Sequence, residues 1–164
     1  MIEHARTWGD MVPHVQTLVA LAAEARTIVE FGVRGGVSTW ALLDGLHPDG
    51  RLTSIDIDPD CLDRVPERVL GDARWTFVVA DTTAPDIQAD LPPHADLFVI
   101  DTSHEYHATI RELEIARRLN AAVIVLHDYN LADVEDAVQG FLRRQPHYTL
   151  TVEPSEWGLA VLRR

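Results

Sequence analysis

Residues 27–39 read TIVEFGVRGGVST, in which a short apolar run leads through a glycine-rich turn to the start of a helix. The apolar part, Thr27–Phe31, is typical of a buried strand. Gly32, Gly35 and Gly36 follow it and permit positive φ angles and a close approach of a ligand to the backbone. The next helix would offer free N–H groups to an anion. The stretch therefore predicts the first unit of a ligand-binding α/β fold, with a tight turn that binds nothing as the alternative.

The spacing of these glycines excludes two familiar sites. It matches neither GxGxxG, the dinucleotide fingerprint, nor GxxxxGK[ST], the phosphate-binding loop. All 14 basic residues are arginine, so the lysine of a phosphate-binding loop is missing. A nicotinamide-dependent dehydrogenase is accordingly the least favoured of the enzyme classes considered.

Further apolar runs alternate with stretches of helical period along the chain, which indicates βαβ units. The expected parallel strands are Thr27–Phe31, Leu52–Asp56, Trp75–Ala80, Leu97–Asp101 and Ala122–Leu126. The expected helices are Val15–Ala25, Val37–Leu46, Pro59–Leu70, Tyr106–Leu119 and Leu131–Arg144. Tyr148–Glu153 and Gly158–Leu162 lie too close in sequence for a crossover and should pair as an antiparallel hairpin. We predict an α/β, doubly wound (Rossmann-like), mostly parallel seven-stranded sheet with a C-terminal antiparallel hairpin.

Length and composition favour one ordinary globular domain. The 164 residues are expected to form a single domain, with 1–26 as a helical cover and 27–164 as a cofactor-binding core. A single cysteine, Cys61, allows no intramolecular disulfide. The net charge of -12 disfavours nucleic-acid partners. No apolar run exceeds six residues and the first ten residues are unlike a signal peptide, so we expect no membrane association and a cytoplasmic location.

Carboxylates stand at or beside the end of every expected parallel strand. Ligands of open α/β sheets bind at this edge, where the strand order reverses. Asp56 could accept both hydroxyls of a ribose, because Asp58 before Pro59 suits the alternative role of helix cap better. Asp81 would lie where the protein could contact an adenine. The full set of strand-end carboxylates is Glu30, Asp56, Asp81, Asp101 and Asp128.

Two of these carboxylates have histidines beside them. Asp101 precedes His104 by three residues, and His127 directly precedes Asp128. Since the two aspartates belong to neighbouring strand ends, they could hold a hard cation such as Mg²⁺ between them. A lone aspartate at a strand end is more often a cap or a solvated loop residue, but two with adjacent histidines favour a functional site.

The segments EFGVRGGVST at 30–39 and SIDIDPDC at 54–61 resemble class I S-adenosylmethionine-dependent methyltransferases. Within these the chain is most similar to the metal-dependent small-molecule O-methyltransferases, of the catechol type and the macrocin or cephalosporin-hydroxylase-like group. The resemblance implies that Glu30 and the Gly32–Gly36 turn hold the methionine part of the cofactor, with Ser38 as a further cofactor residue. It also implies that Asp56 binds the ribose and that Asp81 lies near the adenine.

The same resemblance assigns the chemical end of the site. Asp101 and Asp128 become metal ligands, and His104 becomes the general base, at a position where the catechol type has lysine. The third ligand is His127 or Asn130, of which His127 is favoured. The remaining histidines are interpreted as surface or packing residues, namely His4, His14, His47, His94, His107 and His147. Trp8, Trp40 and Trp157 are candidates for an acceptor pocket, with the core as the commoner place for tryptophan.

Together these features predict a Mg²⁺-dependent O-methyltransferase that uses S-adenosylmethionine and a small-molecule hydroxyl acceptor, either a sugar or a phenol of natural-product type. A homodimer is left open. The alternatives are a non-catalytic or partner-completed protein of the same fold, and a hydroxylase-like enzyme on that fold.

Overall fold

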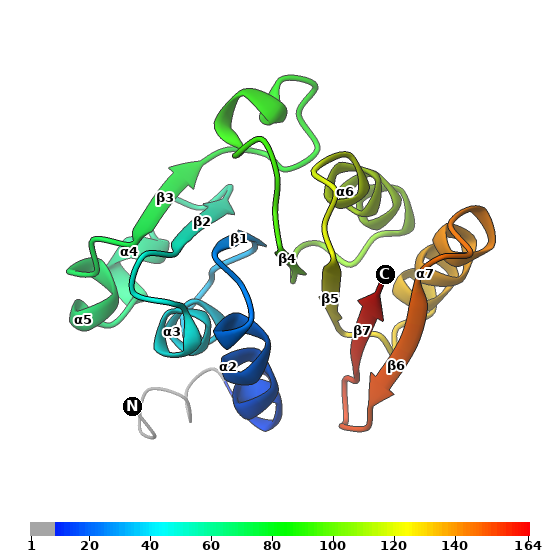
Figure 1. The fold of residues 1–164 in the computed structure, drawn as a ribbon, viewed down its shortest axis with the longest axis horizontal. Coiled ribbons are helices and arrows are strands. Elements are labelled where there is room, and N and C mark those ends of the chain that lie inside the picture. Colours follow the sequence, from blue (N-terminus) through cyan, green and yellow to red (C-terminus); the bar gives the residue numbers. More distant parts are fainter. Residues whose placement is uncertain (1–8) are drawn as a thin grey trace.

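The computed structural model describes residues 9–164, in which seven strands form one mixed sheet (Figure 1). The strands are β1 (Thr27–Phe31), β2 (Arg51–Asp56), β3 (Trp75–Val79), β4 (Leu97–Ile100), β5 (Val123–His127), β6 (Thr149–Glu153) and β7 (Leu159–Arg163). Their order is β3-β2-β1-β4-β5-β7-β6, with β1 to β5 parallel and β7 antiparallel to both β5 and β6. The predicted fold class and the C-terminal hairpin are confirmed.

Helices cover both faces of this sheet (Figure 1). One face carries α2 (Val15–Ala23), α3 (Val37–Gly45), α4 (Cys61–Arg64) and α5 (Glu67–Leu70); the other carries α6 (Tyr106–Arg118) and α7 (Ala132–Arg144). Two short 3₁₀ turns, η1 (Val12–His14) and η2 (Ile87–Asp90), complete the described chain. The central strands are buried on both sides, which is why their sequences are almost continuously apolar.

The predicted single helix over Pro59–Leu70 is wrong. The structure has two short helices, α4 and α5, separated by Val65 and Pro66. Proline disfavours the helical region for the residue before it, and Val65 is extended, with ψ of 136°. Asp58 is also not the helix cap, because α4 begins later and its N-cap position is Asp60. Most other predicted boundaries differ from the observed ones by one or two residues.

Strand order reverses between β1 and β4, and this reversal places the candidate site. The chain leaves β1 on one side of the sheet and enters α3, whereas β4 leads to α6 on the other side. The strand ends between these helices form the crevice in which doubly wound sheets bind ligands. Within residues 9–164, no helix is long and apolar enough to span a membrane.

Candidate active site

A cavity of about 500 Å³ opens at the carboxyl ends of β1 to β4. Its lining includes four of the predicted site residues, which are Gly32, Asp56, Asp81 and Asp101. Apolar contacts come from Ile55 and Ile57, and the Ile57 side chain is 69% exposed. The cavity therefore combines carboxylates with apolar surface at the reversal point of the sheet.

The glycine turn needs glycine at its first position. Gly32 has a φ of 90°, and a Cβ there would lie 1.8 Å from the carbonyl oxygen of Asp101. The Gly32 N–H also donates to the carbonyl of Ile55 at 2.8 Å. The turn is thus held directly against the ends of β2 and β4, which a larger residue would prevent.

Asp56 fastens this turn from the neighbouring strand. Its Oδ2 accepts the backbone N–H groups of Val33 at 2.8 Å and of Arg34 at 3.1 Å, and its Oδ1 accepts that of Asp58 at 2.9 Å. The carboxylate also lines the cavity. Asp56 is therefore placed where the sequence predicted it, and its contact with a ribose stays a prediction.

Glu30 lies on β1, does not line the cavity and is fully buried. Its carboxylate accepts hydroxyl hydrogen bonds from Ser38 at 2.6 Å, Thr39 at 2.8 Å and Ser54 at 2.5 Å. Burial raises the pKa of Glu30 to about 7, although the three hydroxyl donors oppose the rise. Glu30 and Ser38 thus connect β1, α3 and β2, and their predicted contact with the methionine part of a cofactor stays a prediction.

Asp81 lies at the far end of the cavity, after β3, and is exposed. Its Oδ1 accepts the N–H and the hydroxyl of Thr83, both at 2.7 Å, and these bonds lower the pKa of Asp81. The residue is therefore held as a carboxylate at the position where the sequence predicted the adenine end.

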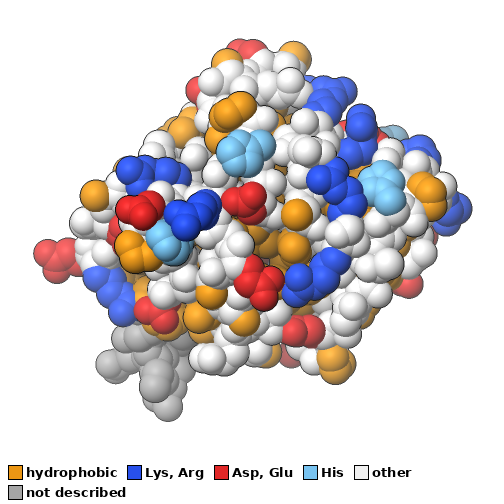
Figure 2. Space-filling view, in the orientation of Figure 1, with side chains coloured by type: hydrophobic (Ala, Val, Ile, Leu, Met, Phe, Trp, Pro, Cys, Tyr) orange, Lys and Arg blue, Asp and Glu red, His pale blue; other side chains and the backbone are white. Residues whose placement is uncertain are grey.

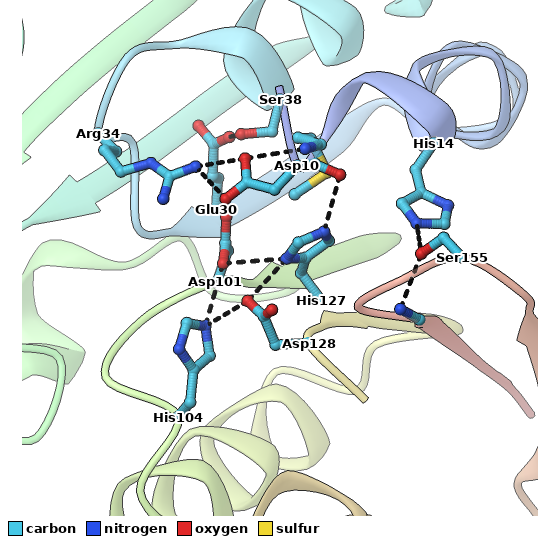
Figure 3. A network of polar contacts seen from close by, with 12 residues as sticks. Asp10, His14, Glu30, Arg34, Ser38, Asp101, His104, His127, Asp128 and Ser155 are labelled. Atoms are coloured by element: carbon cyan, nitrogen blue, oxygen red, sulfur yellow. Dashed lines mark hydrogen bonds and ion pairs between the residues drawn. The ribbon is translucent and has the colours of Figure 1, made fainter. Parts of the chain in front are cut away.

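Four ionisable side chains, which we call the Asp–His cluster, meet beside the cavity at the ends of β4 and β5: Asp101, His104, His127 and Asp128 (Figure 3). His104 Nε2 lies 3.2 Å from Asp101 Oδ1 and 3.0 Å from Asp128 Oδ2. His127 Nδ1 lies 2.8 Å from the same Asp128 oxygen and 3.6 Å from the same Asp101 oxygen. Each carboxylate therefore faces both imidazoles.

The four side chains of the cluster set one another's protonation state. Burial raises the pKa of Asp101, but the two imidazoles outweigh it and bring the pKa to about 2. The pKa of Asp128 is lowered for the same reason. Burial acts to lower the pKa of each histidine, but the carboxylates raise it to about 9 for His104 and about 10 for His127. The two aspartates are thus anions and the two histidines cations, so the charges of the cluster balance as long as both imidazoles keep their protons.

Three members of the cluster could hold a metal ion. Asp101, His104 and Asp128 each offer a donor atom within 4.8 Å of the others. His127, the predicted third ligand, contacts Asp128 through Nδ1 while its Nε2 lies 3.3 Å from the carbonyl oxygen of Asp10. The alternative ligand, Asn130, turns to the β6–β7 connection and donates to the carbonyls of Ser155 and Glu156. The structure thus brings His104 into the donor set and keeps His127 beside it.

Sequence reasoning missed Arg34 and Asp10, which form an ion pair above the cluster (Figure 3). Arg34 belongs to the glycine turn, has a positive φ of 47° and lines the cavity. Its position inside GVRGG was a signal that was available in the sequence. Asp10 gave none, because its partner Arg34 lies 24 residues away in the sequence.

A second polar cluster joins His14 to the C-terminal hairpin. His14 Nδ1 lies 3.2 Å from Glu153 Oε2, and its Nε2 lies 2.9 Å from Ser155 Oγ. The order Ser–His–Glu is that of a hydrolase triad, but Ser155 Oγ already accepts the Gly158 N–H at 2.8 Å and does not line the cavity. Since His14 is buried, the cluster is interpreted as packing, as the sequence predicted for this histidine.

The two described tryptophans lie outside the cavity, and their predicted part in an acceptor pocket stays a prediction. Trp40 packs partly buried against the core of its sheet face and beneath Arg68, and Trp157 is 39% exposed. Neither lines the cavity. Trp8, like His4, lies outside the described residues.

The sheet order and the cavity at its reversal point define a Rossmann-like methyltransferase fold. Comparison with known families agrees: the chain belongs to the methyltransferase domain family, whose model matches residues 29–129, well over half of the chain.

Individual relatives are similar over different extents. A protein of Mycobacterium sp. (strain KMS) named "Putative O-methyltransferase" is 42% identical over 55 residues, which are 32% of this chain and 25% of the relative. The match thus spans about a quarter of that curated relative. An O-methyltransferase from Bacillus cereus, solved in complex with SAH, superposes with a TM-score of 0.75 at 19% identity over 93% of this chain and 81% of that one.

A second solved structure is the O-methyltransferase TomG from Streptomyces achromogenes, involved in tomaymycin synthesis and solved in complex with SAM. It gives a TM-score of 0.69 at 20% identity and covers 92% of this chain and 79% of TomG. At these identities the two structures show that the fold is shared.

Proposed function

We propose that this protein transfers a methyl group from S-adenosylmethionine to a hydroxyl oxygen of a small molecule. One observation carries the proposal: Asp101 both lines the cavity and belongs to the Asp–His cluster. A cofactor in the cavity and an acceptor at the cluster would then be adjacent. The family match and the similarity to O-methyltransferases that bind SAM or SAH support the same assignment.

The cavity suits an adenosyl cofactor in size and chemistry. About 500 Å³ lies within the range of ligand pockets. Asp56 would accept hydrogen bonds from the ribose, Ile57 would offer apolar surface to the adenine, and Asp81 would lie at the adenine end. The methyl group of the cofactor is already activated by the positive sulfur, so the protein must position an oxygen nucleophile and remove its proton.

The donor set of the cluster suits a divalent cation. Asp101 and Asp128 supply the carboxylate oxygens that Mg²⁺ prefers, and we assign His127 as the third ligand. Such a cation would lower the pKa of an acceptor hydroxyl and orient it. The geometry also admits His104 as the third ligand, and the two assignments differ in whether loss of His104 weakens metal binding.

His104 is assigned as the general base. Its Nε2 lies at the centre of the cluster, within 3.2 Å of both aspartates. Those carboxylates contact the imidazole and, in the cluster alone, raise its pKa to about 9, which favours the protonated form. Neutralising their charge would release that hold, so that His104 could accept the proton of the acceptor hydroxyl.

The acceptor is proposed to be a small molecule with a sugar or phenolic hydroxyl rather than a nucleic acid. On the face in Figure 2, arginine side chains are scattered among acidic and neutral ones instead of forming one basic patch. The net charge of -12 points the same way. TomG, which acts in the synthesis of a natural product, supports the class of acceptor by likeness of fold.

Metal dependence is tested with Asp128→Asn, because Asp128 belongs to the cluster but does not line the cavity. We expect turnover of an identified acceptor to fall at least about 100-fold while the Kd for S-adenosylmethionine is unchanged. Removal of divalent cations with EDTA should have the same effect on the wild type. Asp136→Asn, at an exposed position of α7, is the matched control and should be neutral. Turnover that survives both chelation and Asp128→Asn would contradict the metal assignment.

A further inference from the structure

Glu112 is a buried carboxylate that neither the cofactor assignment nor the metal assignment uses. It lies on α6 and is 0% exposed. Its Oε1 accepts a hydrogen bond from the hydroxyl of Thr82 at 2.5 Å, and its Oε2 accepts one from the hydroxyl of Thr102 at 2.9 Å. The two oxygens of one side chain therefore fasten two different loops.

These two loops form opposite parts of the candidate site. Thr82 follows Asp81 after β3, at the proposed adenine end, and Thr102 follows Asp101 after β4, next to the Asp–His cluster. Both threonines line the cavity. In the sheet, β2 and β1 lie between β3 and β4, so no strand pairing joins the two loops. Glu112 supplies a link between them that the sheet does not.

An apolar residue would be the simpler choice at this position. The other buried residues of α6 are Thr109, Leu113, Ile115 and Ala116, and burial raises the pKa of the glutamate. Burying a carboxylate costs free energy unless hydrogen bonds compensate it. A buried acid kept on the core side of a helix, with both oxygens bonded to cavity residues, indicates a role in the site.

We propose that Glu112 is a positioning residue that sets the adenine-end loop and the metal-end loop relative to each other. The inference rests on the proposed function, since it assigns Thr82 and Thr102 to the two ends of one cofactor site. Glu112 itself does not line the cavity, so it would act through the two threonines.

The test compares variants that keep or lose the two hydrogen bonds. Glu112→Gln retains one acceptor and gains a donor, which a threonine hydroxyl can accept, whereas Glu112→Leu keeps the volume and loses both bonds. Leu113→Val, the next buried residue on α6, is the matched control for a weakened core. Calorimetric titration with S-adenosylmethionine gives the Kd of each variant, and thermal unfolding gives its Tm.

We expect Glu112→Leu to raise the Kd for S-adenosylmethionine about tenfold, and the Kd of Glu112→Gln to stay within about threefold of that of the wild type. Leu113→Val should lower the Tm without changing the Kd. Thr82→Val and Thr102→Val should each weaken binding, and adding Thr82→Val to Glu112→Leu should cause little further loss, because that bond is already gone. These single-hydroxyl variants keep the test valid if Glu112→Leu does not fold.

Hydrogen–deuterium exchange gives a readout that needs no cofactor. Exchange of backbone amides at 81–83 and at 101–103 should rise together in Glu112→Leu and stay unchanged in Leu113→Val. Wild-type affinity in folded Glu112→Leu, or exchange that rises equally in both variants, would overturn the inference alone. Absence of S-adenosylmethionine binding by the wild type would instead overturn the proposed function and the inference with it.

Discussion

Two residues of the Asp–His cluster have backbone conformations that residues other than glycine rarely adopt. His104 has a φ of 60° and Asp128 a φ of 56°, both in the left-handed region. Such conformations cost about 1–3 kcal/mol each and persist where the surrounding structure enforces them, often at functional sites. In these conformations His104 Nε2 and Asp128 Oδ2 lie 3.0 Å apart. The backbone strain at these two residues thus coincides with the close approach of their side chains.

Removal of His104 tests its role as the base. His104→Ala should lower kcat about 10²–10⁴-fold, the usual contribution of a general base, and leave the Kd for S-adenosylmethionine unchanged. Metal binding that is also unchanged would favour the base over the ligand assignment. His107→Ala, an exposed histidine on the first turn of α6, is the control. Equal losses in the two variants would count against His104.

Individual residues were predictable where chemistry coincided with a strand end. Asp56, Asp81, Asp101 and Asp128 follow apolar runs, and parallel strands bring such ends to one edge. The role of Glu30 was harder to predict, because its three hydroxyl partners come from α3 and β2 and leave it buried. The amide of Asn130 is directed by the hairpin turn, which no local pattern reveals.

At the scale of elements, the glycine turn after β1 decides whether the site can form. Gly32 N–H extends the hydrogen bonding of β1 to β2, while Asp101 N–H bonds to Phe31 and extends that of β4 to β1. The turn is therefore packed between two strand ends. The sequence of the turn predicted its position at the end of β1. The sequence of Pro59–Leu70, in contrast, predicted one helix, and the helix is interrupted because Pro66 forces Val65 out of the helical region.

Gly32→Ala should disrupt this turn. The added Cβ would collide with the Asp101 carbonyl at 1.8 Å, and the φ of 90° is itself unfavourable for alanine, so we expect a loss of more than about 1–3 kcal/mol in the free energy of unfolding. Gly71→Ala is the matched control, since Gly71 has a φ of -87° and its nearest contact would be an ordinary 3.6 Å. That control should change stability by no more than about 0.5 kcal/mol. Denaturant unfolding that ranks the two variants equally would contradict this view of the turn.

At the scale of the whole molecule, the central sheet separates two apolar cores. One lies under α2 to α5 and the other under α6 and α7. Glu30 is an ionisable group in this interior, and its pKa is raised from 4.5 to about 7. The overall architecture was predictable because periodicity reports burial, but the placement of a carboxylate within it was not.

The pH dependence of folding should report on Glu30. A carboxyl whose pKa is higher in the folded than in the unfolded chain binds its proton more tightly when folded, so stability falls as the pH rises from about 4.5 to about 7. At about 1.4 kcal/mol per pKa unit, the loss is roughly 3 kcal/mol. Glu30→Gln should flatten this part of the profile, and Glu67→Gln, at an exposed position, should not. Parallel profiles of the wild type and Glu30→Gln, measured by chemical unfolding across this range, would refute the assignment.

The proposed function requires that the cavity at the carboxyl ends of β1 to β4 binds S-adenosylmethionine. Calorimetric titration of the purified protein tests it most directly, with NAD as the control ligand and Asp56→Asn as the control variant. We expect micromolar binding of S-adenosylmethionine, weaker binding by Asp56→Asn, and no binding of NAD. Folded protein that binds no S-adenosylmethionine, or that binds NAD in its place, would contradict it.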